Sequence, residues 1–326
     1  MRKSLFALIA FAVASVPLGA EAQTAGKVYR VGFLVSTMSP GAIAMRDGVS
    51  RSLAQRGYVP DRSLVIEMRS ADGKPSRFPE LAKELAASGV EVIVTMGYPA
   101  ARAAKDATST VPIIVNAAGD PVETGLAVSL SRPGGNLTGI SDMASELSVK
   151  RLDLLKEAVP GLKRVSMLWN ADDLGMTTRY RAASAAASTL GVAVQPLGVR
   201  EPDDFDAAFA AMNRERPDGI LMVTDSLTVL NRKRVFEFAV AQRIPAIYEF
   251  DFLVRDGGLM SYGPDGKETI ARIADLVDRI LKGAKSADLP FEQPTRFRFV
   301  INKKTADALG LVLPAAVLAR ADEVIE

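Results

Sequence analysis

The sequence contains no cysteine and no histidine among its 326 residues. Without cysteine, disulfides, thiol catalysis and a lipid-modified cysteine at a processing site are excluded. Histidine is the commonest metal ligand and the side chain that titrates nearest neutral pH. Its absence excludes serine–histidine catalysis, histidine general bases and histidine metal sites. Carboxylate or lysine chemistry stays open, but these absences favour a binding protein over an enzyme, with no metal and no cofactor.

The sequence also lacks any concentration of charge and any long apolar run beyond its first residues. The net charge of +2 is spread along the chain, and no basic block indicates a nucleic-acid partner. No later stretch approaches the roughly 18 uninterrupted apolar residues that a membrane-spanning helix needs. A mature chain of about 300 residues is typical of two domains of ordinary size.

The N-terminus has the pattern of a secretory signal peptide. Arg2 and Lys3 are followed by an apolar run from Leu5 to Val16 and by a small-x-small site at 20–22. We therefore predict a signal peptide over 1–22, cleaved near Ala22, and export to a bacterial periplasm. A retained N-terminal anchor is the alternative.

From Lys27 onward, short β-rich runs alternate with helical patterns. The strands "YRVGFLV", "SLVIEMRS", "VEVIVTM" and "VPIIVNA" are separated by helices at about Ala42–Arg56, at Phe78–Ser88 and from Pro99. Strands separated by helices of this length indicate βαβ units and a parallel sheet covered on both faces. At the joint "VTMGYPA", Pro99 is expected at the first helical position.

The second half of the chain repeats the first. The strand candidates "KRVSMLWN", "VAVQPLGV", "PDGILMVTDS" and "IPAIYEFD" match the four earlier ones in the same order. Four matches in order are more than the apolar similarity of unrelated strands explains. We predict an α/β fold with two Rossmann-like lobes, each containing a parallel sheet.

Further segments indicate that the chain crosses between the lobes. "GDPVETGLAVSLSRPGGNLTGIS" suits a bend and a crossing strand, and a strand, a helix at Lys267–Lys282 and a terminal segment follow the second repeat. Several crossings make a hinge with a cleft beside it. We expect one lobe over 27–140 plus about 262–288, and the other over 141–261 plus about 289–326.

In parallel α/β sheets, ligands bind beyond the carboxyl ends of the strands, where helix N-termini present unpaired N–H groups. The first lobe offers hydroxyls and backbone amides there, which suit a carboxylate, and the second offers acids, which suit an ammonium or hydroxyl. Aromatic and methionine side chains add apolar surface. The candidate ligand-binding residues are Ser36, Thr37, Met38, Met96, Gly97, Tyr98, Asn116, Asn170, Asp225, Ser226, Tyr248, Glu249 and Phe250.

Several of these positions have a purely structural alternative. Ser36, Thr37, Asp225 and Ser226 are also typical helix N-caps. Tyr248, Phe250 and Trp169 could pack in the core or at the edge of a lobe. Asp120, in the turn-like "GDPV", is expected to be structural.

The chain resembles the ABC-transporter substrate-binding family of the tryptophan/tyrosine-permease type. The resemblance rests on "GDPVETGLAVSLSRPGGNLTGIS", "YGPD", "DLPFEQPTRFRFVINKKTADALGL" and "LARADEVIE", and it covers essentially the whole mature chain. It implies the type I periplasmic binding-protein fold, with three crossover strands and ligand capture by hinge closure. It also implies delivery to an inner-membrane permease that a separate ATPase powers.

The leading hypothesis is a monomeric periplasmic solute-binding protein for a small carboxylate-bearing ligand, an amino acid or an aromatic acid. An extracytoplasmic sensor that presents its ligand to a membrane receptor is the alternative. A glycosidase-like enzyme using Asp225 and Glu249 as an acid/base pair is a third hypothesis, which the missing catalytic residue types disfavour.

Overall fold

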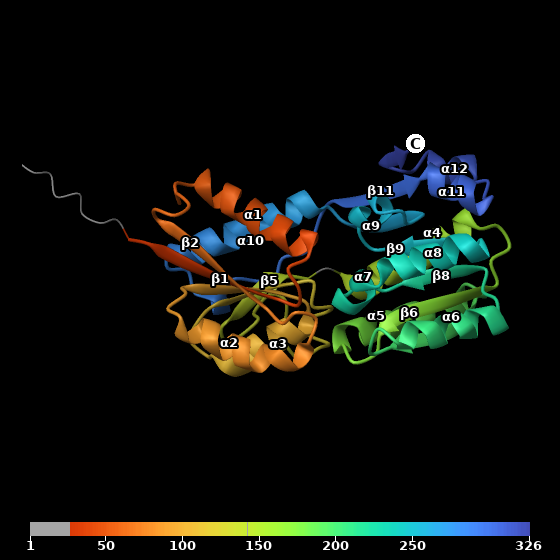
Figure 1. The fold of residues 1–326 in the computed structure, drawn as a ribbon. Coiled ribbons are helices and arrows are strands. Elements are labelled where there is room, and N and C mark those ends of the chain that lie inside the picture. Colours follow the sequence, from red (N-terminus) through yellow and green to blue (C-terminus); the bar gives the residue numbers. More distant parts are fainter. Residues whose placement is uncertain (1–26, 142) are drawn as a thin grey trace, which may run out of the picture.

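The fold consists of two α/β lobes, each a sheet with helices on both faces, seen in a computed structural model that describes residues 27–141 and 143–326 (Figure 1). The predicted signal peptide over 1–22 lies outside the described residues. We use N-lobe for the five-stranded sheet and its helices, and C-lobe for the seven-stranded sheet and its helices.

All strand pairs of the N-lobe sheet are parallel, in the order β2-β1-β3-β4-β5. The strands are β1 (Tyr29–Val35), β2 (Leu64–Ser70), β3 (Val92–Met96), β4 (Ile113–Asn116) and β5 (Leu137–Ile140). The helices are α1 (Pro40–Ala54), η1 (Pro75–Arg77), α2 (Phe78–Ala87), α3 (Tyr98–Ala107), α10 (Gly266–Leu281) and η2 (Ser286–Asp288).

The C-lobe sheet has the order β12-β11-β10-β9-β8-β6-β7, and only the pair β10–β11 is antiparallel among the described strands. The strands are β6 (Arg164–Asn170), β7 (Ala193–Val199), β8 (Gly219–Met222), β9 (Ala246–Tyr248), β10 (Met260–Pro264), β11 (Phe297–Asn302) and β12 (Glu323–Ile325). The helices are α4 (Ala144–Ala158), α5 (Leu174–Thr189), α6 (Asp204–Arg214), α7 (Ser226–Leu230), α8 (Arg232–Gln242), α9 (Asp251–Arg255), α11 (Lys303–Leu309) and α12 (Ala315–Leu318).

Each sheet is buried on both faces because its strands are apolar on both sides. In the N-lobe, Phe33 packs with α1 and α10 on one face, whereas Leu34 packs with α2 and α3 on the other. In the C-lobe, Met167 packs with α4 and α5, whereas Leu168 packs with α6 and α8. Neighbouring residues thus face opposite layers, which explains why these strands read as continuous apolar runs.

The internal repeat is confirmed by the order of the strands. The order β2-β1-β3-β4 in the N-lobe recurs as β7-β6-β8-β9 in the C-lobe. The three-crossover fold is also confirmed. Within the described residues the chain passes between the lobes after β5, after β10 and before β11, and α10 lies beside α1 although it is far away in the sequence (Figure 1).

The predicted lobe boundaries stay a prediction, because sheets and packed helices do not by themselves define independently folding domains. Two details of the crossings differ from the expectation. Strand β10 continues to Pro264 in the C-lobe sheet, and Leu289 and Phe291 still pack in N-lobe clusters. Crossing segments are short loops, and composition alone does not fix their ends.

Candidate functional site

The loops that follow the strands of the two lobes meet each other. After β4, Gly119 contacts Gly175 of α5: a β-carbon built on Gly119 would lie 3.0 Å from the Gly175 Cα. After β2, a β-carbon on Gly73 would lie 3.5 Å from Cδ1 of Leu230, at the end of α7. The loops at the carboxyl ends of both sheets therefore face each other, as a strand-end site between the lobes requires.

In the N-lobe, two of the three hydroxyl groups in the loop after β1 take no part in the helix cap. The cap of α1 is Ser39, whose hydroxyl accepts from the Ala42 N–H, so neither Ser36 nor Thr37 is the cap. Both are half-buried at the carboxyl end of β1, and Met38 beside them is 47% exposed. The structural alternative for Ser36 and Thr37 is thus wrong.

At the joint between β3 and α3, no side chain caps the N-terminus of the helix. Gly97 is the N-cap, with φ of +87°. Its N–H donates to the carbonyl of buried Asn116 across 2.9 Å, which ties this joint to the end of β4. The helix begins at Tyr98 and not at Pro99, which occupies the second position. The positive φ explains the glycine, since a β-carbon is disfavoured there.

In the C-lobe, Asp225 is the N-cap of α7 and part of a capping box with Thr228. Asn170 at the end of β6 donates to Oδ2 of Asp225 across 2.6 Å, so the loops after β6 and β8 are joined. Burial raises the pKa of the Asp225 carboxyl, while the N–H and hydroxyl donors around it oppose that rise. Ser226 is half-buried and is the first residue of α7.

Three aromatic side chains near the strand ends of the C-lobe pack on other aromatic rings. Tyr248 is 1% exposed and packs edge-on against Phe236 at 5.2 Å, and burial raises the pKa of its hydroxyl. It is a core residue, because β9 is buried on both faces and its last side chain points into the α8 layer. Trp169 is also buried and stacks on Tyr180 at 3.7 Å. Phe250 is half-buried and stacks on Phe252.

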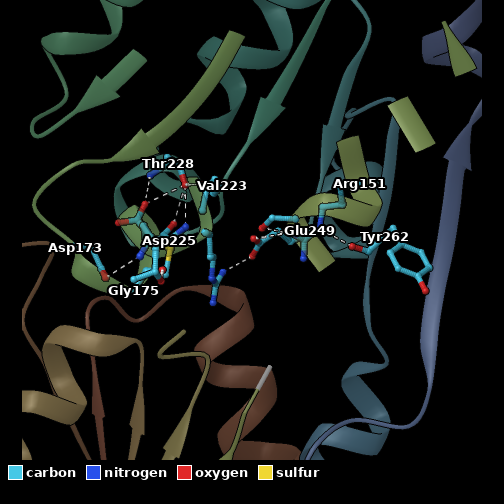
Figure 2. A network of polar contacts seen from close by, with 12 residues as sticks. Arg151, Asp173, Gly175, Val223, Asp225, Thr228, Glu249 and Tyr262 are labelled. Atoms are coloured by element: carbon cyan, nitrogen blue, oxygen red, sulfur yellow. Dashed lines mark hydrogen bonds and ion pairs between the residues drawn. The ribbon is translucent and has the colours of Figure 1, made fainter. Parts of the chain in front are cut away.

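Glu249 lies in a buried ion-pair cluster and does not present a free carboxylate. Its Oε1 accepts from Arg151 across 3.0 Å, and its Oε2 accepts from Arg179 across 2.7 Å; all three side chains are at most 2% exposed. Arg151 also donates to the carbonyl of Tyr262 (Figure 2). The prediction that Glu249 binds the ligand directly is therefore corrected, because the side chain is 1% exposed and two buried guanidinium groups already compensate its charge.

A further buried acid, Asp173, stands at the start of α5. It is 3% exposed, and its carboxylate accepts from the Met176 N–H as the N-cap (Figure 2). Burial, and next the nearby charge of Asp225, raise the pKa of Asp173 from 3.8 to about 6. Two acids with raised pKa values thus lie at the C-lobe side of the cleft, a combination typical of functional sites.

The sequence reasoning missed Arg151, Arg179 and Asp173. The arginines were indistinguishable from solvent-facing helix residues by composition, but a positional signal existed. Arg179 follows Met176 at i+3 and precedes Ala183 at i+4, so it belongs to the buried face of α5. A buried arginine requires an acidic partner, and Glu249 meets that requirement.

Neither a metal-binding group of carboxylates nor a membrane-spanning helix occurs in the described part of the chain. Over 27–141 and 143–326, carboxylates do not gather in groups of three or more that would hold a metal ion. Over the same residues, no helix has the length and apolarity to cross a membrane.

The sequence model of the ABC transporter substrate binding protein family matches residues 30–325. The chain belongs to this family. It is therefore the solute-binding component of an ABC transporter and belongs to a non-enzymatic family, as the resemblance implied.

Three similar proteins match most of this chain, and the two with solved structures share its fold. A tyrosine-binding protein of Clostridioides difficile is 26% identical over 273 residues, 83% of this chain and 78% of that protein. A structure of a conserved domain protein from Vibrio cholerae is 27% identical, with a TM-score of 0.87 over 91% of this chain and all of that one. An ABC domain in complex with L-Trp from Streptococcus pneumoniae is 27% identical, with a TM-score of 0.85 over 92% of this chain and all of that one.

Proposed function

We propose that this protein captures an aromatic L-amino acid between its lobes in the periplasm and, as a monomer, delivers it to the permease and ATPase of its transporter. The ligand class is supported by the relatives, one described as tyrosine-binding and one solved with L-Trp. The observation that carries the proposal is the meeting of the strand-end loops at Gly119–Gly175 and at Gly73–Leu230, which encloses the cleft from both lobes.

The N-lobe is suited to the carboxylate of such a ligand. The N-terminus of α3 has no side-chain cap. Because the Gly97 and Ala101 N–H groups already donate to carbonyl groups and Pro99 has no N–H, the N–H groups of Tyr98 and Ala100 are the ones left for an anion. A helix N-terminus favours a carboxylate through these N–H groups and through the helix dipole. The hydroxyls of Ser36 and Thr37 lie on the same edge of the sheet and add neutral donors.

The C-lobe is suited to the ammonium group. Asp225 presents a carboxylate whose pKa is raised by burial, and Asn170 fixes one of its oxygens. A ligand ammonium placed there would favour the ionised form of Asp225, so ligand charge and site charge stabilise each other. Tyr98 and Met38, half-buried and exposed respectively, supply apolar surface for an aromatic side chain.

Closure then depends on the ligand because each lobe holds one end of it. A cavity of about 200 Å³ lies at the hinge, between Glu249 and Asp251 of the C-lobe, the crossing segment 263–267 and Ile270 of α10. The crossing segment thus lies beside open space. Closure removes water from the cleft and strengthens the polar contacts within it.

A thermal-shift screen tests this proposal. L-Tryptophan, L-tyrosine and L-phenylalanine are compared with aliphatic amino acids, benzoate and sugars. The cognate ligand should raise the melting temperature, since a ligand present at 100 times its Kd adds about 2.7 kcal/mol of stability, and it should compact the protein in small-angle scattering. If no aromatic amino acid shifts the melting temperature, the ligand class is wrong.

A further inference from the structure

One close contact between the lobes is made by backbone atoms, at Ala118 and Gly119 of the N-lobe and Gly175 of the C-lobe. A β-carbon built on Gly175 would lie 2.8 Å from the carbonyl oxygen of Ala118 and 3.2 Å from its carbonyl carbon. A methyl group cannot occupy this position unless backbone moves, because real β-carbons essentially never approach so closely. The two lobes therefore reach their observed arrangement only because residue 175 has no side chain.

The N-lobe side of this contact is a rigid loop. Ala117 and Gly119 have φ values of +55° and +78°. Asp120 holds the loop by accepting from the N–H groups of Val122 and Glu123 across 2.7 and 2.9 Å, and the Thr124 hydroxyl donates to the Asp120 carbonyl. A loop fixed in this way cannot yield easily to a new methyl group, so a clash would be relieved by separating the lobes.

A second contact between the lobes involves a side chain that can move. Gly73 is opposed by the end of the Leu230 side chain, which is 53% exposed and can change rotamer. The two contacts thus differ. The backbone contact at Gly175 fixes how closely the lobes approach, whereas the contact at Leu230 can adjust to that distance.

We propose that Gly175 is a positioning residue that sets how far the lobes close, and so sets ligand affinity without requiring contact with the ligand. This inference builds on the proposed function, but the closure itself is defined without any ligand. Gly175 has no positive φ and lies at the second position of α5, where alanine is compatible with the helix. Gly175→Ala therefore obstructs closure. Within the C-lobe, the nearest atom that the added methyl group meets is Oδ1 of Asp173, at 3.2 Å, and that side chain can shift by a few tenths of an ångström. Gly119, with its positive φ, offers no such clean substitution.

The chain contains a matched control. Gly41 occupies the second position of α1, the helix that corresponds to α5 in the repeat, and both helices have a side-chain N-cap, Ser39 and Asp173. A β-carbon on Gly41 would meet nothing closer than the Ser39 hydroxyl at 3.9 Å. Gly41→Ala makes the same chemical change without the clash.

The first measurement detects closure of the two lobes in the absence of ligand. Because the chain has no cysteine, a Gly73→Cys/Leu230→Cys pair gives one disulfide, whose formation rate reports how often the lobes close at the Leu230 contact. The strain of Cys at position 73 is common to all the proteins compared. In the Gly175→Ala background, cross-linking should slow by about tenfold or more, as a clash of this size implies. In the Gly41→Ala background it should be unchanged.

The second measurement uses the ligand found by the thermal-shift screen. Gly175→Ala should lower affinity by about tenfold or more, chiefly through faster dissociation, while the melting temperature without ligand does not fall. Equal cross-linking rates in the two backgrounds, or no cross-linking in the parent pair, would overturn the proposal. So would a Gly175→Ala protein that melts earlier without ligand at unchanged cross-linking, since Gly175 would then be only a packing residue. If no ligand is found, cross-linking alone still decides this inference.

Discussion

Asn170 and Asp225 are joined by a hydrogen bond of 2.6 Å, although 55 residues separate them in the chain. The bond connects the loops after β6 and β8, which are neighbouring strands in the C-lobe sheet. It leaves Asp225 with one oxygen engaged in capping α7 and the other oriented by an amide. A carboxylate held in this way is preorganised for a cation, which is why we assign the ligand ammonium to it.

Asp225→Asn should weaken binding of the cognate amino acid by tenfold or more, because a charge-assisted hydrogen bond contributes about 1.5–3 kcal/mol. The matched control is Asp218→Asn. Asp218 accepts from two backbone N–H groups at the amino ends of the strands, far from the carboxyl ends where Asp225 lies. Calorimetric titration of both variants checks the assignment, and equal affinities would remove Asp225 from the site.

Tyr98→Ala should weaken ligand binding by more than tenfold and leave the ligand-free fold intact, because Tyr98 is half-buried at the end of β3 and offers a flat surface to an aromatic ligand. Tyr98→Phe should bind nearly as well, since it keeps the ring. Far-ultraviolet circular dichroism checks the fold, and titration checks affinity. Unchanged affinity in Tyr98→Ala would show that this segment only connects β3 to α3 and does not bind the ligand.

Glu249→Gln should lower the free energy of unfolding by about 3–5 kcal/mol, because removing one partner of a buried ion pair leaves the other charges poorly compensated. The control is Asp106→Asn, which breaks an exposed pair with Arg102 and should change stability by less than about 1 kcal/mol. Urea unfolding measures both. A loss below about 1 kcal/mol for Glu249→Gln would show that the cluster does not stabilise the C-lobe.

The raised pKa of Asp173 predicts a pH dependence of a definite sign. Its folded pKa is about 6 and its ordinary value is 3.8, so the folded state binds the proton more tightly than the unfolded state. The free energy of unfolding contributed by Asp173 therefore falls as pH rises from about 4 to about 6. Relative to Asp173→Asn, the wild-type protein should lose about 1–3 kcal/mol between pH 4 and pH 7.

Other carboxyl groups, such as Glu268 with its pKa lowered to about 2, give the opposite slope. Carboxyl groups that do not interact with Asp173 are common to both proteins and drop out of the difference between wild type and Asp173→Asn. If the free energy of unfolding of the wild type relative to Asp173→Asn stayed constant with pH, or rose, the raised pKa of Asp173 would be contradicted.

The fold could be predicted from sequence because its determinants are periodic and local. Apolar strands such as Tyr29–Val35, the turn at Gly97-Tyr98-Pro99 and the repeated strand order each have a signature along the chain. The positions of Asn170 and Asp225 followed from one rule, that ligands bind beyond strand ends.

The errors in the site arose where the direction of a side chain decides its role. Tyr248 ends β9 and Glu249 directly follows it, yet one packs on Phe236 and the other pairs with two arginines. A strand three residues long gives no alternation from which to tell these directions. The contact between Gly119 and Gly175 joins two lobes, so no local pattern could reveal it.

The central claim is that the N-lobe holds the carboxylate of an aromatic amino acid and the C-lobe holds its ammonium group. Calorimetric titration tests it with three forms of the ligand identified by the screen: the L-amino acid, the amine without the carboxylate, and the acid without the amine. For L-tryptophan these are tryptophan, tryptamine and indole-3-propionate. We predict saturable binding of the amino acid at one site per chain, with each truncated form weaker by tenfold or more. Equal binding of the amine or the acid would show that one lobe does not hold its assigned end, and would contradict the account.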